Sequence, residues 1–277
     1  MAKRFENKVV VITGAGGVLC NAFAQAFAAE GAKTVLLDLN EEAAAKNAAA
    51  LTQQGYTATA YQADVLDTIS LEEVREKINR DFGTCDILIN GAGGNNPRAT
   101  TDNEFHTNDL PEGTKTFFDL EKSGFEFVFN LNILGTILPT QVFAKDMINK
   151  KGANIINVSS MNAYTPLTKI PAYSGAKAAV SNFTQWLAVH FSKTGIRCNA
   201  IAPGFLVSNQ NRSLLFDTEG NPTQRAKKIL NNTPMGRFGD TNELIGGLLF
   251  LADETQASFI NGVILPIDGG FNAYSGV

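Results

Sequence analysis

The fold is decided by the stretch Val9-Val10-Val11-Ile12-Thr13-Gly14-Ala15-Gly16-Gly17-Val18-Leu19, in which an apolar, β-branched run passes through a glycine cluster into a segment of helical period. A strand that is apolar at every position is typical of a parallel sheet covered by helices on both faces. Glycines directly after such a strand let the backbone turn tightly and approach a pyrophosphate, which then meets the free N–H groups of the following helix. The stretch therefore predicts the first βα unit of a dinucleotide-binding sheet.

The same alternation of short strands and longer helices continues along the chain. Strands are predicted at 8–13, 33–38, 57–62, 86–90, 153–159, 196–202 and 262–267. Helices are predicted at 18–30, 41–54, 70–82, 124–149, 172–194 and 241–254. Five of these helices are followed by glycines, which commonly end a helix: Gly31, Gly55, Gly83, Gly152 and Gly195. This order predicts an α/β fold, a Rossmann-type doubly wound parallel sheet of about seven strands with helices on both faces.

No repeat, low-complexity tract or linker interrupts the alternation, so we expect a single NAD-binding catalytic domain over residues 1–277. Two polar segments, 94–123 and 204–223, do not fit the alternation. Both follow strands at the carboxyl edge of the predicted sheet, where ligands bind in such folds. Long loops in compact domains are usually either functional or disordered, and the position of these two favours substrate-binding insertions.

The composition excludes several classes of protein. The 277 residues carry a net charge of −4 without a basic block, which argues against binding to nucleic acid or to an anionic membrane surface. No window approaches the ~18 uninterrupted apolar residues of a membrane span, and the N-terminus enters a strand without the apolar segment of a signal peptide. Three Cys and two His show neither a disulfide framework nor metal-ligand spacing. We therefore expect a cytoplasmic protein without a metal.

The end of the second predicted strand indicates which dinucleotide is bound. Asp38 lies 24 residues after Gly14, where a carboxylate can accept hydrogen bonds from the ribose hydroxyls of the cofactor and repel a 2′-phosphate. No Arg or Lys stands beside it, so NAD is favoured over NADP; the alternative is a solvated Asp at a strand end. The predicted cofactor-binding residues at this end of the sheet are Gly14, Gly16, Gly17, Val18, Leu19, Asp38, Asp64, Val65, Asn90, Gly91 and Ala92.

A second set of polar residues indicates acid–base chemistry. Tyr173 and Lys177 lie four residues apart on a predicted helix and so share a face, where a cation lowers a phenol pKa that is ordinarily near 10. One such pair arises easily by chance in 277 residues. However, Ser160 closes the fifth predicted strand 13 residues before Tyr173, and Asn132 lies in the preceding helix. The combined placement of these four residues along the predicted strands and helices favours a catalytic site.

Over essentially its whole length the chain resembles the short-chain dehydrogenase/reductase family. The matching residues are Thr13-Gly14, Asp64, Asn90-Gly91-Ala92-Gly93, Asn132-Ile133-Leu134-Gly135, Ser160, Tyr173 with Lys177, Pro203-Gly204 and Asp268-Gly269-Gly270. The resemblance implies a catalytic tetrad of Asn132, Ser160, Tyr173 and Lys177, in which Asn132 holds a water of a proton relay. It also implies a homotetramer and a nicotinamide site bordered by Tyr173, Lys177, Pro203, Gly204 and Ser208.

Three positions depart from the family pattern. Val18 and Cys20 stand where the family's glycine turn has its last two glycines, so Gly16 and Gly17 are expected to supply the turn. The contacts to the phosphates are left open by this change. Gly91 stands where the family motif has a second Asn.

The two polar segments predict the substrate class. Amides and guanidinium groups suit a polyhydroxylated, carboxylated molecule, with Arg as the carboxylate clamp; the alternative is that these are solvated loop residues. The candidate substrate-binding residues are Asn95, Asn96, Arg98, Ser160, Asn162, Gln210, Asn211 and Arg212.

One branch of the family, the bacterial D-mannonate oxidoreductases (fructuronate reductases), is the most similar. The resemblance rests on Gly94-Asn95-Asn96-Pro97-Arg98-Ala99-Thr100-Thr101-Asp102-Asn103, on Ser159-Ser160-Met161-Asn162-Ala163, on the insertion before Asn132 and on the ending 270–277. It implies NAD-dependent interconversion of D-fructuronate and D-mannonate. The alternatives are a related sugar-acid or polyol dehydrogenase, such as a 5-keto-gluconate reductase, and a non-catalytic NAD(H)-binding regulator, which would not need to keep both Tyr173 and Lys177.

Overall fold

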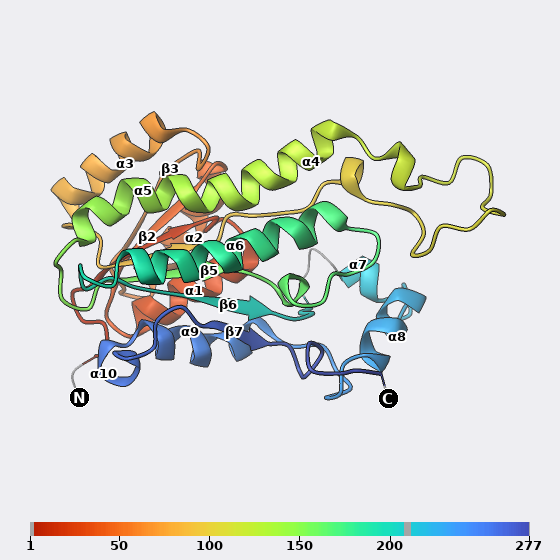
Figure 1. The fold of residues 1–277 in the computed structure, drawn as a ribbon. Helices are drawn as coiled ribbons and strands as arrows, with labels where there is room; N and C mark the ends of the chain where they lie inside the picture. Colours follow the sequence, from red (N-terminus) through yellow and green to blue (C-terminus); the bar gives the residue numbers. More distant parts are fainter. Residues whose placement is uncertain (1–2, 208–211, 277) are drawn as a thin grey trace.

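A parallel sheet of seven strands in the order β3-β2-β1-β4-β5-β6-β7 forms the centre of the computed structural model (Figure 1), which describes residues 3–207 and 212–276. The strands are β1 (Val9–Thr13), β2 (Lys33–Asp38), β3 (Ala58–Gln62), β4 (Ile87–Asn90), β5 (Asn154–Val158), β6 (Arg197–Pro203) and β7 (Ile264–Ile267). The strand order steps outward in both directions from β1 and β4, so the doubly wound sheet predicted from the sequence is confirmed.

Helices cover both faces of the sheet, and β1 shows why. Its side chains alternate: Val10 and Ile12 pack into the cluster that contains α1 (Val18–Ala29), α2 (Glu41–Gln53) and α9 (Ile245–Ala252). Val9 and Val11 pack into the opposite cluster, which contains α3 (Thr68–Asp81), α5 (Gly135–Met147) and α6 (Pro171–His190). Every residue of this strand is buried, as the continuous apolar run predicts. The five glycines expected to end helices all have a positive φ, between 79° and 101°.

The helix predicted at 124–149 consists of α4 (Lys122–Phe129), one π-helical turn η3 (Asn130–Leu134) and α5. The extra residue of the π turn is accommodated by side chains, because the Asn132 amide donates to the Val128 carbonyl (2.8 Å) and the Thr136 hydroxyl donates to the Asn132 carbonyl (2.8 Å). By length and composition alone, Lys122–Met147 could cross a membrane. Half of its most apolar window is buried against the rest of the protein, as in the core helix of a globular fold.

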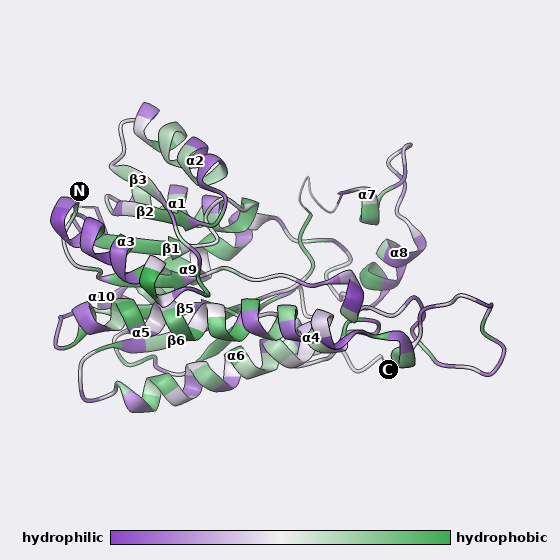
Figure 2. Cartoon of the chain, turned by 90° about the horizontal axis from the view of Figure 1, so that it is seen from above, coloured by the Kyte–Doolittle hydropathy of each residue, from purple (hydrophilic) through white to green (hydrophobic). Residues whose placement is uncertain are grey.

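The two polar segments form the far end of the molecule. The first contains two short 3₁₀ turns, η1 (Pro97–Ala99) and η2 (Phe117–Asp119), and reaches away from the sheet at the end opposite the N-terminus (Figures 1 and 2). The second leads to two helices that were not predicted, α7 (Arg212–Leu215) and α8 (Gln224–Asn231). Leu215, Ala226 and Ile229 of these helices form one small cluster with aromatic residues of the neighbouring loops. The helices have only four and eight residues, which is too short for a helical pattern to be distinguished from a polar loop. The remaining elements are η4 (Met161–Ala163), η5 (Thr241–Leu244) and α10 (Glu254–Ala257).

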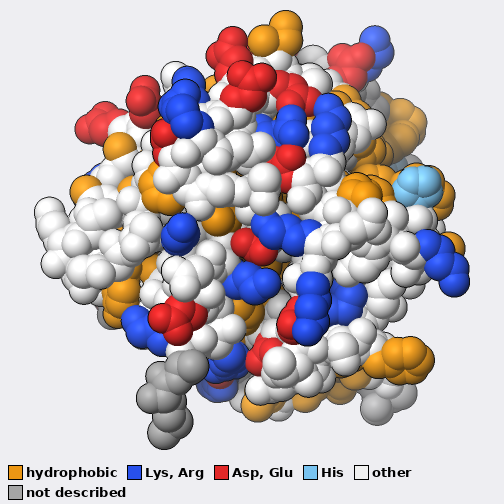
Figure 3. Space-filling view, turned by 90° about the vertical axis from the view of Figure 1, so that its left-hand side faces the viewer, with side chains coloured by type: hydrophobic (Ala, Val, Ile, Leu, Met, Phe, Trp, Pro, Cys, Tyr) orange, Lys and Arg blue, Asp and Glu red, His pale blue; other side chains and the backbone are white. Residues whose placement is uncertain are grey.

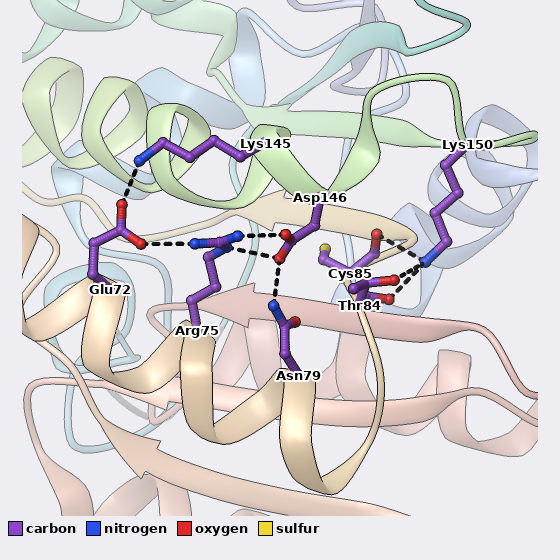
Figure 4. A network of polar contacts seen from close by, with 8 residues as sticks. All are labelled: Glu72, Arg75, Asn79, Thr84, Cys85, Lys145, Asp146 and Lys150. Carbon is purple, nitrogen blue, oxygen red and sulfur yellow. Dashed lines mark hydrogen bonds and ion pairs between the residues drawn. The ribbon is translucent and has the colours of Figure 1, made fainter.

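The amino edge of the sheet is rich in charges of both signs (Figure 3). Arg75 of α3 donates to both carboxylate oxygens of Asp146 on α5 and to Glu72, and Asn79 donates to Asp146 at 2.9 Å (Figure 4). Burial would raise the pKa of Asp146, but the hydrogen bonds from Arg75 and Asn79 outweigh it and hold that pKa below its ordinary value. This network fastens α3 to α5.

Candidate active site

The glycine turn joins the ends of β1 and β4. The Thr13 hydroxyl accepts a hydrogen bond from the Gly91 N–H (3.1 Å), and Gly14 adopts φ 70° so close to the next loop that a Cβ atom would lie 2.9 Å from Ala92 Cα. Gly17 is the N-cap residue of α1 and has extended backbone. The first N–H groups of α1 have no carbonyl within the helix to bind, and Val18 and Leu19 line the adjacent cleft. The turn therefore offers backbone donors and the positive end of a helix to an anion.

Two of the three departures from the family pattern, Cys20 and Gly91, are one structural exchange. A Cβ atom added at Gly91 would collide with Cys20 Sγ, so the cysteine side chain fills the space that a side chain at position 91 would need. Burial raises the pKa of the Cys20 thiol to about 12, so the thiol is uncharged at physiological pH. Its role here is to fill the space beside Gly91.

Asp38 is fixed at one end of the cleft. Its Oδ2 accepts from the Gly16 N–H and its Oδ1 from the Asn40 N–H, both at 2.9 Å. A Cβ atom on Gly16 would lie 3.0 Å from the carboxylate, so a glycine is required for this close approach. The predicted role of Gly16 and Gly17 in shaping the turn agrees with these contacts, which aim a carboxylate into the cleft.

The cleft has a volume of about 610 Å³. Most of the predicted cofactor residues line it: Gly14, Gly17, Val18, Leu19, Asp38, Asp64, Val65, Gly91, Ala92, Tyr173 and Lys177. Gly93, the last residue of the predicted Asn90-Gly91-Ala92-Gly93 loop, lines it too. The other lining residues were not predicted and are mostly apolar: Cys20, Leu39, Ala63, Leu66, Phe127, Leu131, Val158, Leu206 and Thr241.

Some predicted cofactor residues lie beneath the cleft or beside it. The Asn90 amide is buried and donates to Thr140 Oγ1 (2.9 Å) and Asn157 Oδ1 (2.8 Å), so it ties strands to a helix. Pro203 is buried at the end of β6, and a Cβ atom on Gly204 would lie 2.5 Å from Asp268 Cα, so this glycine allows the chain to pass close to the end of β7. Ser208 lies outside the described residues.

Tyr173 and Ser160 meet at the inner end of the cleft. Ser160 follows β5 and Tyr173 lies in the first turn of α6, so the topology brings both to the carboxyl edge of the sheet. Burial raises the pKa of Tyr173 above its ordinary value, and a side-chain hydrogen bond with Ser160 partly offsets that rise. The expectation that Lys177 sets this pKa below 10 is therefore not met by the protein groups, because desolvation is the largest effect.

Lys177 and Asn132 complete the group. Lys177 Nζ donates to the Val158 carbonyl (2.8 Å) and lies 5.7 Å from the centre of the Tyr173 ring. A Cβ atom on Gly93 would lie 2.7 Å from Asn132 Oδ1 and 3.1 Å from Lys177 Nζ, so both polar atoms face the same backbone position. Burial lowers the pKa of Lys177 to about 8. The four residues expected to form a tetrad are thus gathered around one point.

The predicted substrate residues fall into three groups. Asn162 is buried beside Ser160, whose hydroxyl accepts its N–H (3.3 Å), and its Oδ1 has no hydrogen-bond partner among the described residues. Asn95 donates to Thr100, whereas Asn96 caps η1 by accepting the Arg98 N–H (2.9 Å). The third group lies in the second polar segment, where the Arg212 guanidinium stacks on Phe216, and Gln210 and Asn211 are outside the described residues.

Comparisons with known proteins agree with this geometry. The model of the short chain dehydrogenase family matches residues 8–218. A relative from Haemophilus influenzae, named an uncharacterized oxidoreductase, is 71% identical over 98% of this chain and 95% of its own length. A crystal structure from Haemophilus influenzae with bound NAD, provisionally named a D-mannonate oxidoreductase, has 71% identity and a TM-score of 0.97 over 99% of this chain and 98% of that one.

A more distant solved structure is a gluconate 5-dehydrogenase from Burkholderia cenocepacia in complex with NADP and tartrate. It is 27% identical, with a TM-score of 0.83 over 98% of both chains. The family resemblance that the sequence motifs predicted is confirmed by the match over residues 8–218. The chain belongs to the short-chain dehydrogenase family and is an oxidoreductase.

Proposed function

We propose that this protein is an NAD-dependent dehydrogenase of a sugar acid, and that its substrate pair is D-mannonate and D-fructuronate. The observation that carries the proposal is the gathering of Ser160, Tyr173, Lys177 and Asn132 beside one cleft, which Tyr173 and Lys177 line together with Asp38. The similar protein with bound NAD and a provisional D-mannonate name supports both the cofactor and the substrate class.

The residues of the cleft fit NAD. The N-terminus of α1 and the glycine turn would hold the pyrophosphate, and the Asp38 carboxylate would accept hydrogen bonds from the adenosine ribose. The same carboxylate would repel the additional 2′-phosphate of NADP. Lys177, whose ammonium group faces the Gly93 backbone at the cleft wall, would bind the nicotinamide ribose.

When bound, NAD⁺ would supply the acceptor for a hydride from the carbon that carries the substrate hydroxyl. Tyr173, as phenolate, takes the hydroxyl proton during oxidation and, as phenol, returns it during reduction. Ser160 hydrogen-bonds to the substrate oxygen and to Tyr173, which orients the proton transfer. Because burial raises the pKa of Tyr173, the positive charges of Lys177 and of the oxidised nicotinamide must stabilise the phenolate. Asn132 would hold a water that connects Lys177 to a proton relay.

A spectrophotometric assay at 340 nm tests this function. The purified protein is offered D-fructuronate, D-tagaturonate, 5-keto-gluconate and simple ketoses with NADH or NADPH. We expect turnover of D-fructuronate with a preference for NADH. Activity confined to 5-keto-gluconate would replace the substrate by that of the similar gluconate 5-dehydrogenase. Tight NADH binding without any turnover would instead indicate the non-catalytic regulator.

The single catalytic domain, the homotetramer and the cytoplasmic location also remain proposals. The tetramer can be tested by sedimentation of the protein with and without NAD.

A further inference from the structure

A second cavity, with a volume of about 480 Å³, lies where three loops at the carboxyl edge of the sheet meet. The first polar segment contributes Thr100 and Glu104, and residues 165–170 form another wall. Phe205, residues of α8 and Phe271 close the rest. The volume is in the range of pockets that bind small molecules.

The charged residues of this cavity are mostly cations. Lys169, Arg225 and Lys228 line it together with one carboxylate, that of Glu104. Glu104 accepts a hydrogen bond from Lys228 at 2.8 Å, so this pair is neutralised and joins the first polar segment to α8 across the cavity. Within the described part of the chain, the side chains of Lys169 and Arg225 make no hydrogen bond or ion pair. The cavity is therefore cationic in a protein whose net charge is −4, and it suits an anion.

The cavity adjoins the reacting groups through its own walls. Residues 165–170 connect η4, which follows Ser160, to α6, which carries Tyr173. Across from them, Phe205 lines this cavity while the next residue, Leu206, lines the cofactor cleft. The cavity is thus joined to the cofactor cleft by chain segments that the two share, so a substrate with an oxygen at Ser160 and Tyr173 could extend toward it.

The backbone conformation of Lys169 is a second observation that indicates a functional role. Its φ of 73° is in the left-handed region, where a side chain is strained and glycine is favoured. The Lys169 carbonyl accepts the Thr101 N–H at 2.9 Å, which holds the loop in this conformation against the first polar segment. Strained non-glycine backbone is concentrated at sites that bind ligands, because the side chain is needed there.

We propose that Lys169 and Arg225 bind the carboxylate of the sugar-acid substrate and so determine specificity for an acid over a neutral polyol. This inference rests on the proposed function. It replaces the Arg98 and Arg212 clamp expected from the sequence with two cations that share a cavity. The guanidinium of Arg225 can bind a carboxylate through two parallel hydrogen bonds, and the ammonium of Lys169 adds a point charge.

The test compares D-mannonate with D-mannonamide, which has the same hydroxyl groups but no charge. We expect Arg225→Met and Lys169→Met each to raise KM for D-mannonate about 10-fold or more, with kcat little changed, since a charge-assisted hydrogen bond is worth that much. The KM for D-mannonamide should stay within about twofold, since no charged partner is lost. Lys227→Met is the matched control, because Lys227 is an exposed cation of α8 that does not line the cavity.

A further variant separates ligand binding from backbone strain. Lys169→Gly removes the side chain but accepts a positive φ, so we expect a higher Tm together with the raised KM for D-mannonate. An unchanged ratio of acid to amide specificity in the Lys169 and Arg225 variants would overturn the inference and leave the proposed function intact. An equal loss in Lys227→Met would also overturn it. If the wild-type protein turns over no sugar acid with NAD, the proposed function and this inference both fail.

Discussion

The two edges of the sheet handle charge in opposite ways. At the amino edge, Arg75, Asp146 and Glu72 are bound to one another, and the carboxylate of Asp146 has partners on both of its oxygens. At the carboxyl edge, the buried ammonium of Lys177 donates to the Val158 carbonyl, its one hydrogen-bond acceptor among the described residues, and burial lowers its pKa to about 8. Charged side chains are buried in both regions. Among the described residues, only those of the amino edge are neutralised by side chains of opposite charge.

This difference indicates which charged groups stabilise the fold and which serve binding or catalysis. A network in which each charge has a partner fixes two helices, and it leaves no group free to bind anything else. An incompletely partnered cation costs stability, and it is retained where it acts on a ligand or a reacting group. The comparison predicts that substitutions of the buried charged residues at the amino edge change unfolding without changing turnover, and that substitution of the buried Lys177 at the carboxyl edge does the reverse at neutral pH.

Tyr173→Phe should have the largest effect, because it removes the proton donor and leaves the ring. We expect kcat to fall about 10³-fold or more, the range of general acid–base catalysis, with NADH affinity within about twofold. Turnover is measured at 340 nm and NADH binding by fluorescence. Tyr56→Phe, which changes a tyrosine that stacks with Lys3, is the control. Turnover that survives Tyr173→Phe would remove this residue from the mechanism.

Asp146→Ala should weaken the amino edge. Removing one partner of a largely buried pair leaves Arg75 without its main acceptor, and we expect the free energy of unfolding to fall by about 3 kcal/mol. The exposed pair Lys122–Glu126 (2.9 Å) offers the control, since Lys122→Met should cost less than about 0.5 kcal/mol. Urea denaturation gives the first quantity, and kcat should match the wild type. A loss of turnover in a folded Asp146→Ala protein would break the comparison between the edges.

Lys177→Met should abolish turnover without destabilising the fold at neutral pH. The pKa of Lys177 is about 8 in the folded protein and ordinarily 10.5, so the unfolded chain binds this proton more tightly. The contribution of Lys177 to stability is therefore lowest below pH 8 and rises as the pH increases to 10.5. Relative to Lys177→Met, the wild type should gain about 3 kcal/mol over this interval, measured by urea denaturation at several pH values. If the difference in unfolding free energy between the two proteins does not change with pH, burial does not lower the pKa of Lys177.

The smallest expected effect is the coupling between Cys20 and Gly91. Gly91→Ala alone should be destabilising because its Cβ atom meets Cys20 Sγ, and Cys20→Gly should relieve part of that cost, about 1 kcal/mol. Gly246→Ala is the control, because a Cβ atom there meets no neighbour within 4 Å. Its effect should add to that of Cys20→Gly. Simple additivity for Gly91→Ala and Cys20→Gly would mean that the two positions are independent.

The sequence predicted the parts of the molecule that depend on local pattern. Apolar runs such as Val9–Thr13 defined the sheet, and residue spacing found Tyr173 and Lys177. It did not predict α8, whose buried residues pack on a neighbour that is itself only one turn long. Nor did it find Lys169 and Arg225, which are far apart in the chain and share a cavity only after folding. Local pattern predicts elements, whereas a site formed by several loops depends on tertiary contacts.

The contact between Cys20 and Gly91 also makes the residues at these two positions depend on each other. A Cβ atom at position 91 collides with Cys20 Sγ, so any larger residue there requires the thiol to move or to be absent. A search that scores the glycine turn and the Asn90-Gly91-Ala92-Gly93 loop separately would count Cys20 and Gly91 as independent mismatches, although their side chains compete for the same space.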